Sequence, residues 1–330
     1  MKKTLYIFQS GELKRKDDTL ELQTENGKKV LPINTISEIH VFGELTINKR
    51  ALEFLTSNKI PAHFYNRYDF YVGTYYPREF VNSGLITIKQ VEFYLNTKER
   101  LYLAKSFILG AVNNIIKNLT YYKRNKPEPM EQAIKSVLEI SKKLASCESA
   151  NEIMAIEGQV RKIYYNAFND ILSNENFYFE ERTKRPPESP INALISFGNS
   201  LLYTTVLSQI YRTHLDPRIS YLHEPNQRSF NLNLDIAEVF KPVIVDRIIF
   251  SLINKRQISL KHFEEGLDYS YLNEEGSKIF VQEFEKKLLT TIKYKNLGNV
   301  SYRRLIRIEC YKLYKHFFRE EIYNPFLSEW

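Results

Sequence analysis

The chain has 330 residues, of which 43% are hydrophobic and 14% are aromatic. That is enough apolar material for two folded domains, and the absence of repeats or low-complexity tracts excludes a disordered or fibrous protein. Lys and Arg number 47 against 39 Asp and Glu. The resulting net charge of +8 favours a polyanionic partner over an acidic small molecule.

The two cysteines, Cys147 and Cys310, stand far apart and have no second cysteine or histidine beside them at metal-binding spacing. Neither a disulfide framework nor a zinc site is indicated, and a reducing compartment is expected. The start MKKTLYIF has too few apolar residues for a signal peptide, and no run approaches the ~20 apolar residues of a membrane span. We therefore expect a cytoplasmic protein with no membrane partner.

Residues 1–75 have the pattern of short β-strands. Alternating runs such as TLYIF, TLELQT, KVLPI and SEIHVFG are separated by turn signals. Asn48 is placed to cap one helix, KRALEFLTSN, after which PAHFYN and FYVGTYY return to strand composition. The pattern predicts a small, sandwich-like β domain that contains one helix and could present an edge to a second copy.

A change of pattern follows this β region. YYPREFVNSG contains a proline, a glycine and no clear period, so we assign residues 76–95 to a linker. Residues 96–330 predict a larger, all-helical domain, with helices near 97–122, 131–146, 150–173, 191–210 and 231–254 and at least two after Ser277. The predicted fold class is therefore α+β.

The stretch from His223 to Pro242 combines a histidine and two carboxylates with a mostly apolar sequence. If the run from about Leu232 is helical, Asp235 and Glu238 project from adjacent turns of one face. Apolar residues surround most of this helix, which predicts a central position, where unpaired carboxylates are costly. Pro242 removes a backbone donor and predicts a kink. The alternative is an acidic first turn that stabilises its own helix dipole, beside a packing histidine.

A third carboxylate lies on another predicted helix. Ser149 and Glu152 form a capping-box pattern, and an apolar stripe at helical spacing runs through Glu157, which is therefore predicted to face inward. Gly158 costs a helix interior about 1 kcal/mol relative to alanine. Its presence indicates a close approach to the backbone there, and simple packing of another helix is the alternative.

Several ordered motifs together resemble the CRISPR-associated spacer-acquisition integrase family over essentially the whole chain. They are the trio Glu157, His223 and Glu238, EG at 157–158, NALISFGNSLLY at 192–203, DPRISYLH at 216–223 and SFNLNLDIAEVFKPVIVDR at 229–247. The chain departs from the family at Ser220, where members usually have glycine, and at Lys241, where many have arginine. Both positions lie beside the motifs and bear on subtype, for which a type I system is expected.

The resemblance implies a metal-dependent DNA endonuclease and integrase. Such a protein inserts captured DNA fragments into a CRISPR array as new spacers, by attack of a 3′-hydroxyl at the repeat ends. Glu157, His223 and Glu238 are implied as the catalytic residues that hold Mg²⁺ or Mn²⁺, and two carboxylates with an imidazole suit these ions. Asp235 is a possible acidic helper.

The resemblance also implies partners. Besides DNA, in the form of captured fragments and the CRISPR repeat, these are a second copy joined through the N-terminal β domains and a small, ferredoxin-like second Cas protein that bridges two such homodimers. Five basic residues are candidates for binding DNA, namely Arg182, Lys184, Arg185, Arg228 and Lys241. The first three lie in the long segment 176–190, for which a solvated charged loop is the alternative.

Two other functions remain open from the sequence. One is a non-catalytic scaffold that binds nucleic acid, and the other is a stand-alone, metal-dependent repair nuclease. Metal-dependent cleavage that is lost on Glu157→Ala would exclude the first. Joining of DNA that depends on the repeat would exclude the second.

Overall fold

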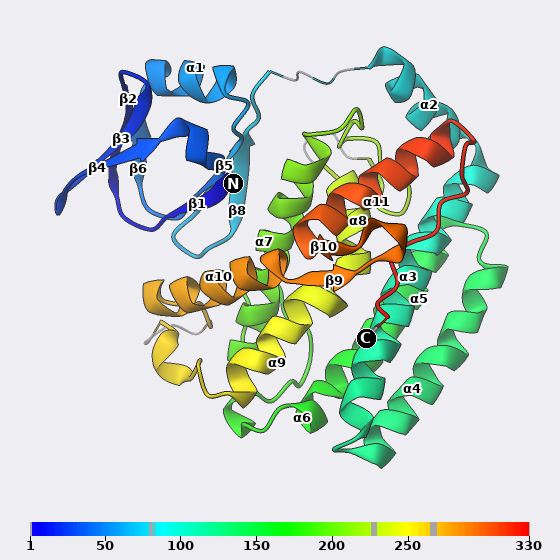
Figure 1. Ribbon diagram of the computed structural model, residues 1–330. Helices are drawn as coiled ribbons and strands as arrows, with labels where there is room; N and C mark the ends of the chain where they lie inside the picture. The colour runs from blue at the N-terminus through cyan, green and yellow to red at the C-terminus, as the bar shows by residue number, and fades with distance from the viewer. Residues whose placement is uncertain (1, 79–80, 82, 226–229, 265–268, 330) are drawn as a thin grey trace. The chain divides into compact units, whose positions relative to one another are not determined.

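The computed structural model describes residues 2–78, 81, 83–225, 230–264 and 269–329. The chain divides into two compact units, Met1–Asn82 and Ser83–Trp330. Strands dominate the first unit and helices the second, as Figure 1 shows by colour along the chain. The predicted α+β class, with a β domain followed by a helical one, is confirmed.

The first unit is built from two four-stranded sheets, in the orders β1-β5-β7-β8 and β4-β3-β2-β6. Asn48 caps the helix as predicted, because its side-chain oxygen accepts the backbone N–H of Ala51 at 2.9 Å. Inward residues of both sheets, such as Leu13 and Ile39, share one core with the helix residue Leu55. The elements are β1 (Lys3–Ile7), β2 (Gly11–Lys16), β3 (Thr19–Thr24), β4 (Gly27–Pro32), β5 (Ile36–Val41), β6 (Leu45–Ile47), α1 (Lys49–Ser57), β7 (Ala62–Tyr65) and β8 (Tyr71–Tyr75).

The second unit consists mainly of helices. They are α2 (Gly84–Leu95), α3 (Thr97–Lys123), α4 (Pro127–Lys142), α5 (Ala150–Asn166), α6 (Phe168–Ile171), α7 (Pro190–Ile210), α8 (Leu232–Phe240), α9 (Arg247–Asn254), α10 (Glu274–Leu289) and α11 (Tyr302–Phe317). A short antiparallel hairpin, β9 (Thr291–Lys293) and β10 (Asn299–Ser301), joins the last two, so the unit is not entirely helical. No helix of the described residues is long and apolar enough to cross a membrane.

The segment 76–95, assigned above to a linker, includes helix α2. Ser83 caps this helix by accepting the N–H of Ile86, and Ile86 and Phe93 are buried. The boundary between the compact units falls just before the cap, at Asn82 and Ser83. Gly84, one of the two residues that suggested a linker, is therefore the first residue of α2, whereas Pro77 lies in the connection before it.

Helix α3 packs against α4, α5 and α8. Figure 1 shows it beside α4. Two asparagines of α3 are fully buried and make hydrogen bonds to the backbone around Pro242. Asn114 donates to the Val239 carbonyl at 2.8 Å, and Asn118 donates to the Pro242 carbonyl at 2.7 Å. These bonds fix the helix that carries Asp235 and Glu238 against α3.

Pro242 changes the helix in the way its chemistry predicts. A proline cannot donate an N–H, so the α-helical ladder is interrupted, and the chain continues as a π-helical turn over Pro242–Asp246. The N–H of Asp246 bonds to the carbonyl of Lys241, five residues back, at 3.1 Å. The run 231–254, predicted as one kinked helix, is thus α8, a π-turn and α9.

Candidate active site

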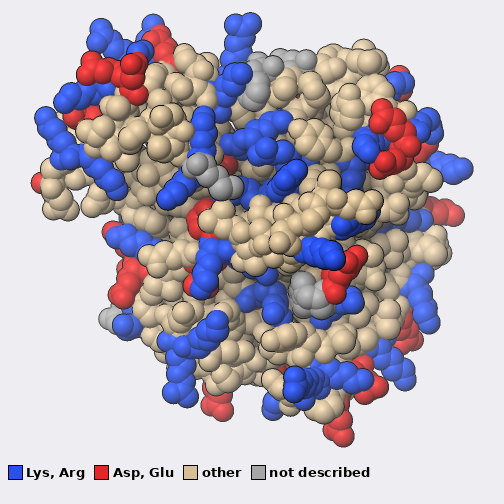
Figure 2. All heavy atoms as spheres, in the orientation of Figure 1, with Lys and Arg blue, Asp and Glu red and all other residues tan. Residues whose placement is uncertain are grey.

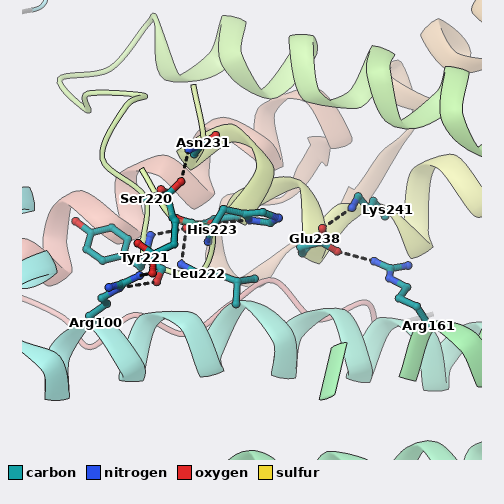
Figure 3. A network of polar contacts seen from close by, with 11 residues as sticks. Arg100, Arg161, Ser220, Tyr221, Leu222, His223, Asn231, Glu238 and Lys241 are labelled. Atoms are coloured by element: carbon teal, nitrogen blue, oxygen red, sulfur yellow. Dashed lines mark hydrogen bonds and ion pairs between the residues drawn. The ribbon is translucent and has the colours of Figure 1, made fainter. Parts of the chain in front are cut away.

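Asp235 organises the start of helix α8. One carboxylate oxygen accepts the backbone N–H groups of Tyr221 and Leu222, at 2.7 and 3.0 Å, and the other accepts the N–H of His223 at 3.1 Å. The carboxylate is fully buried. Asp235 therefore holds the segment 221–223 against the first turn of the helix. Figure 3 shows Tyr221, Leu222 and His223 of this segment close together.

The same carboxylate orients the His223 imidazole, whose Nδ1 lies 2.8 Å from Asp235 Oδ1. Burial lowers the pKa of His223, but the hydrogen bond to Asp235 and the charges of Asp235 and Glu238 outweigh burial and raise it overall. Ser220 adds a bond from its hydroxyl to the His223 carbonyl at 2.6 Å. The residue that replaces the family's usual glycine thus supports the histidine backbone.

Glu157 and Glu238 come together on one arginine. Arg161, one turn after Glu157 on α5, donates from Nε to Glu157 Oε1 at 3.2 Å and from Nη2 to Glu238 Oε2 at 2.9 Å. Its side chain is 7% exposed and that of Glu238 is 4% exposed, whereas that of Glu157 is 27% exposed. Glu157 therefore faces partly inward, at the edge of a buried ion-pair network that reaches Glu238 on α8.

Lys241 completes the surroundings of Glu238 by bonding to its second oxygen, Oε1 (Figure 3). Burial would raise the pKa of Glu238, but the charges of Lys241 and Arg161 lower it to about 2. Both groups are therefore charged near neutral pH. The alternative, that the carboxylate only stabilises the dipole of its own helix, does not hold for Glu238, because Glu238 is paired with both Arg161 and Lys241.

The predicted DNA-binding residues have different surroundings. The Lys184 side chain as a whole is exposed, although nearby chain partly shields its ammonium group from water. That partial burial and the charges of Arg182 and Lys241 lower the pKa of Lys184, while Glu157 and Glu238 oppose the shift. Lys184 thus lies within electrostatic range of both glutamates. Arg182, in contrast, is bound to α7 through Asn192 Oδ1 at 3.0 Å and Ser196 Oγ at 2.9 Å.

Two more of the predicted DNA-binding residues, Arg185 and Arg228, are not connected to the carboxylates by any interaction of the described residues. Arg185 is exposed, and no interaction that we observe brings it to the trio. Arg228 lies outside the described residues, so its predicted role stays a prediction. Of the four basic candidates that lie within the described residues, Lys241 and Lys184 are the ones near the carboxylates.

Gly158 does not mark a contact within the described chain. A Cβ atom built on Gly158 has no heavy atom of the described chain within 4 Å, so neither helix packing nor another internal contact explains the glycine. The alternative given above, packing of another helix against Gly158, is therefore wrong for the described residues, and the expected close approach by something else stays a prediction. The backbone beside Glu157 is open to the outside of the molecule.

The trio fits a divalent ion by donor chemistry. Glu157 Oε2 and His223 Nε2 accept no hydrogen bond from the described residues, and oxygen and imidazole donors of this kind suit Mg²⁺ or Mn²⁺. Glu238 has both oxygens engaged by Arg161 and Lys241. Within the described ranges no three His, Cys, Asp or Glu side chains already surround one point.

Two residues of this network were missed from the sequence. Arg161 follows Glu157 at the i, i+4 spacing of a helical ion pair, and that spacing was an available signal. Asp246 is 1% exposed and lies 3.8 Å from Arg161 Nη1. The position of Asp246 depends on the π-turn, and the spacing of hydrophobic residues in the sequence does not predict such a turn.

The chain was compared with known proteins. The family model described as CRISPR associated protein Cas1 matches residues 5–286. A relative from Thermodesulfovibrio yellowstonii, named as a CRISPR-associated endonuclease Cas1, is 53% identical over 331 residues and is covered fully, as is this chain. The solved structure of a Cas1 protein from Thermotoga maritima has 46% identity and a TM-score of 0.90, covering 99% of this chain and 100% of that one.

More distant structures share the fold alone. A casposase bound to its integration product has 21% identity and a TM-score of 0.87, covering 99% of this chain and 94% of that one. A chain of a Cas6-RT-Cas1–Cas2 complex has 17% identity and a TM-score of 0.84, covering 100% of this chain and 36% of that one. From the matched family model and the full-length relatives, we conclude that the chain belongs to the CRISPR-associated Cas1 family.

Proposed function

We propose that this protein is a metal-dependent integrase that inserts DNA fragments into a CRISPR array by transesterification. In that reaction a 3′-hydroxyl of the captured fragment attacks a phosphodiester at the repeat end. One phosphodiester bond forms as another breaks, and the displaced 3′-oxygen takes a proton. Because the number of phosphodiester bonds is unchanged, the reaction needs no cofactor as an energy source.

One observation carries the proposal within this family. Glu157 on α5 and Glu238 on α8 share the guanidinium of Arg161, and His223 is oriented by Asp235 within electrostatic range of Glu238. Two carboxylates and an imidazole from three separate segments thus occupy one neighbourhood. A chain that used these groups only for packing would gain little from burying this much charge.

Glu157, His223 and Glu238 would hold Mg²⁺ or Mn²⁺, and such an ion, when bound, supplies the charge neutralisation and alignment that phosphoryl transfer requires. The remaining residues have roles of their own. Asp235 keeps Nδ1 of His223 engaged, which leaves Nε2 as the free donor atom. Lys241 neutralises Glu238 until it is displaced, and it then becomes available to a phosphate.

The open surface at Gly158 and the exposed Lys184 indicate where DNA would lie. A side chain at position 158 would occupy space next to Glu157 that the chain leaves empty. Lys184 presents a positive charge within range of the same glutamates. We therefore place the phosphodiester backbone between Gly158 and Lys184. The family resemblance implies in addition a homodimer joined through the N-terminal β domains and a small second Cas protein that bridges two such dimers.

A matched pair of variants on α5 tests the proposal. Glu157→Gln preserves shape and one hydrogen bond to Arg161 but removes the charge, and we expect joining of a short 3′-hydroxyl duplex to a repeat-containing plasmid to fall by about 10²-fold. Glu152→Gln is the control. It makes the same change five residues earlier, in the capping box with Ser149, and should lower the melting temperature slightly while joining continues.

The outcomes separate the competing functions. Joining by Glu157→Gln at the wild-type rate would contradict the proposal. Metal-dependent cleavage by the wild type without joining, in the presence of the partner protein and repeat DNA, would indicate a stand-alone nuclease. Binding of DNA with neither cleavage nor joining would indicate a scaffold.

A further inference from the structure

Asp246 is a buried acid that the proposed function does not use. It is 1% exposed, and neither carboxylate oxygen accepts a well-formed hydrogen bond from the described residues. Burial has the largest effect on the pKa of Asp246 and raises it, but the Tyr164 hydroxyl is nevertheless close enough to lower it. The ion-pair partner of Asp246 is Arg161, whose Nη1 lies 3.8 Å from Asp246 Oδ2 and likewise makes no hydrogen bond to the described chain. A carboxylate with so little local compensation destabilises the fold, so its presence requires another explanation.

The arginine offers that explanation because each of its nitrogens faces a different carboxylate. Nε bonds to Glu157 and Nη2 bonds to Glu238, while Nη1 is directed to Asp246. A guanidinium is a rigid, planar group, so its orientation cannot change at one nitrogen without changing at the others. Asp246 therefore acts on the position of both glutamates through Arg161.

The π-turn is what brings Asp246 to this position. Asp246 follows Glu238 by eight residues, and in a regular α-helix eight residues make about 2.2 turns, which would separate the two side chains by roughly 80° around the axis. A π-turn rotates the chain less per residue, so Asp246 returns toward the face that carries Glu238. The interruption at Pro242 thus places both carboxylates on one arginine.

We propose that Asp246 is a positioning residue, which through Arg161 sets the Glu157 and Glu238 carboxylates for the divalent ion. This inference rests on the proposed function, because it assigns Asp246 no contact with substrate. The physical basis is a shared charge. With Asp246 ionised, the single positive charge of Arg161 is divided among three carboxylates, and less of it competes with the ion for Glu157 and Glu238.

Neutralising Asp246 should therefore have an unusual signature. The whole charge of Arg161 would then fall on the two glutamates, which would hold the guanidinium more tightly and the ion more weakly. The fold itself should lose nothing, because a buried carboxylate without a well-formed hydrogen bond would be replaced by a neutral amide of the same shape, whose oxygen can still accept from the Tyr164 hydroxyl. A merely structural Asp246 predicts the opposite, a less stable fold with unchanged ion binding.

The experiment measures Mn²⁺ binding by the full-length protein, by calorimetry and by electron paramagnetic resonance, together with metal-free thermal melting. We use pH 8, where Asp246 is ionised, because burial raises its pKa to about 7. For Asp246→Asn we expect Mn²⁺ affinity to fall by about tenfold or more, as for other groups that orient metal ligands. The melting temperature should stay equal to that of the wild type or rise.

Two further variants sharpen the test. Arg161→Lys keeps the positive charge, but a single ammonium group cannot pair with three carboxylates in the geometry of a guanidinium. The Mn²⁺ affinity of this variant should therefore also fall by about tenfold. Glu309→Gln is the matched control, because Glu309 is an equally buried acid that binds Tyr323 and the C-terminal segment instead. It should melt at a lower temperature and bind Mn²⁺ like the wild type.

Each outcome of these measurements either supports or overturns the positioning role of Asp246. Wild-type Mn²⁺ affinity in Asp246→Asn or in Arg161→Lys would overturn the inference. Failure of Asp246→Asn to fold would also overturn it, since the inference gives Asp246 no net stabilising role. If the wild type binds Mn²⁺ at the trio but Asp246→Asn binds equally well, the proposed function survives alone. If the wild type binds no Mn²⁺, both fail.

Discussion

Gly158 sits in the middle of α5 beside Glu157, and no atom of the described chain comes near the place where its side chain would be. We expect Gly158→Ala to stabilise the protein by about 1 kcal/mol, because alanine is the better helix former and meets no obstacle. We also expect slower DNA joining, because the added methyl group would occupy the path of the DNA backbone. Urea unfolding and the joining assay measure the two effects.

Gln159→Ala provides the control for this prediction, since Gln159 is the next residue of the same helix and is exposed. It should change neither stability nor joining appreciably. If Gly158→Ala joins DNA as fast as the wild type, then the open surface beside Glu157 is not where DNA lies. A loss of stability in Gly158→Ala would instead indicate a contact that the described residues do not make.

The buried Asp246 predicts a pH dependence of stability. Burial raises its pKa from 3.8 to about 7, although Arg161 opposes the shift. The unfolded carboxyl loses its proton near pH 4, so between about pH 4 and pH 7 the folded chain binds more protons and the free energy of unfolding falls as pH rises. In chelator, Asp246→Asn should gain stability relative to wild type, by up to about 4 kcal/mol at pH 8 and much less at pH 5.

Urea titrations of both proteins at the two pH values measure that difference. Asp246→Asn differing from wild type by the same amount at pH 5 and pH 8 would show that Asp246 keeps an ordinary pKa in the fold. The prediction concerns the metal-free protein, so it is independent of any bound ion.

At this scale the sequence showed which residues carry charge but not what surrounds them. Glu157, Asp235 and Glu238 could be singled out because each falls on a predicted apolar helix. Arg161 and Asp246 escaped because their importance comes from contacts between α5 and the π-turn, which lie far apart in the chain. The inward tilt of Glu157 was foreseeable, while its partial exposure depends on how α5 packs.

At the scale of elements, the C-terminal segment after α11 is bound to the helices that carry the candidate site. Glu309 of α11, almost completely buried, accepts the Tyr323 hydroxyl at 2.8 Å and the Phe326 N–H at 2.9 Å. Asn114 of α3 bonds to this segment at Phe326 and Ser328 and to Val239 of α8. The C-terminal segment is therefore linked to α8 through Asn114, which makes hydrogen bonds to both.

We expect Glu309→Gln to weaken this attachment. The amide can accept only with its oxygen, and the bond from Lys312 loses its ionic character, so the loss should be about 1–3 kcal/mol. The measurements are the urea midpoint and the rate of proteolytic cleavage between residues 319 and 329, which should rise. Unchanged cleavage together with unchanged stability would show that the packed rings of Tyr323 and Phe326, rather than Glu309, hold the segment.

Element boundaries show what periodicity can predict. The capped helices α1 and α5 begin where Asn48 and Ser149 indicated, because a cap is a local feature. The hairpin β9–β10 was missed, since three-residue strands are too short to establish an alternating pattern. The single predicted helix 231–254 became two because Pro242 replaces one helical turn by a wider one, which only the hydrogen-bond ladder reveals.

For the whole molecule, the basic composition predicts a polyanionic partner but does not predict where such a partner binds. On the face shown in Figure 2, Lys and Arg side chains are spread over the surface, with Asp and Glu in small groups between them. The net charge of +8 is therefore not confined to one patch in that view. Which cations meet DNA has to be argued from those near the carboxylates, of which the exposed Lys184 is the most accessible.

This charge distribution predicts how DNA binding depends on salt. Affinity for a short duplex should fall steeply between 50 and 200 mM salt, because each phosphate contact releases counterions on binding. Lys184→Ala should weaken binding about equally for all sequences and reduce the slope of log affinity against log salt by about 1. Lys135→Ala, an exposed lysine on α4, should leave the slope unchanged. Equal slopes of log affinity against log salt for the wild type and Lys184→Ala would show that Lys184 does not contact DNA. A wild-type affinity that does not change with salt would contradict binding dominated by phosphate contacts.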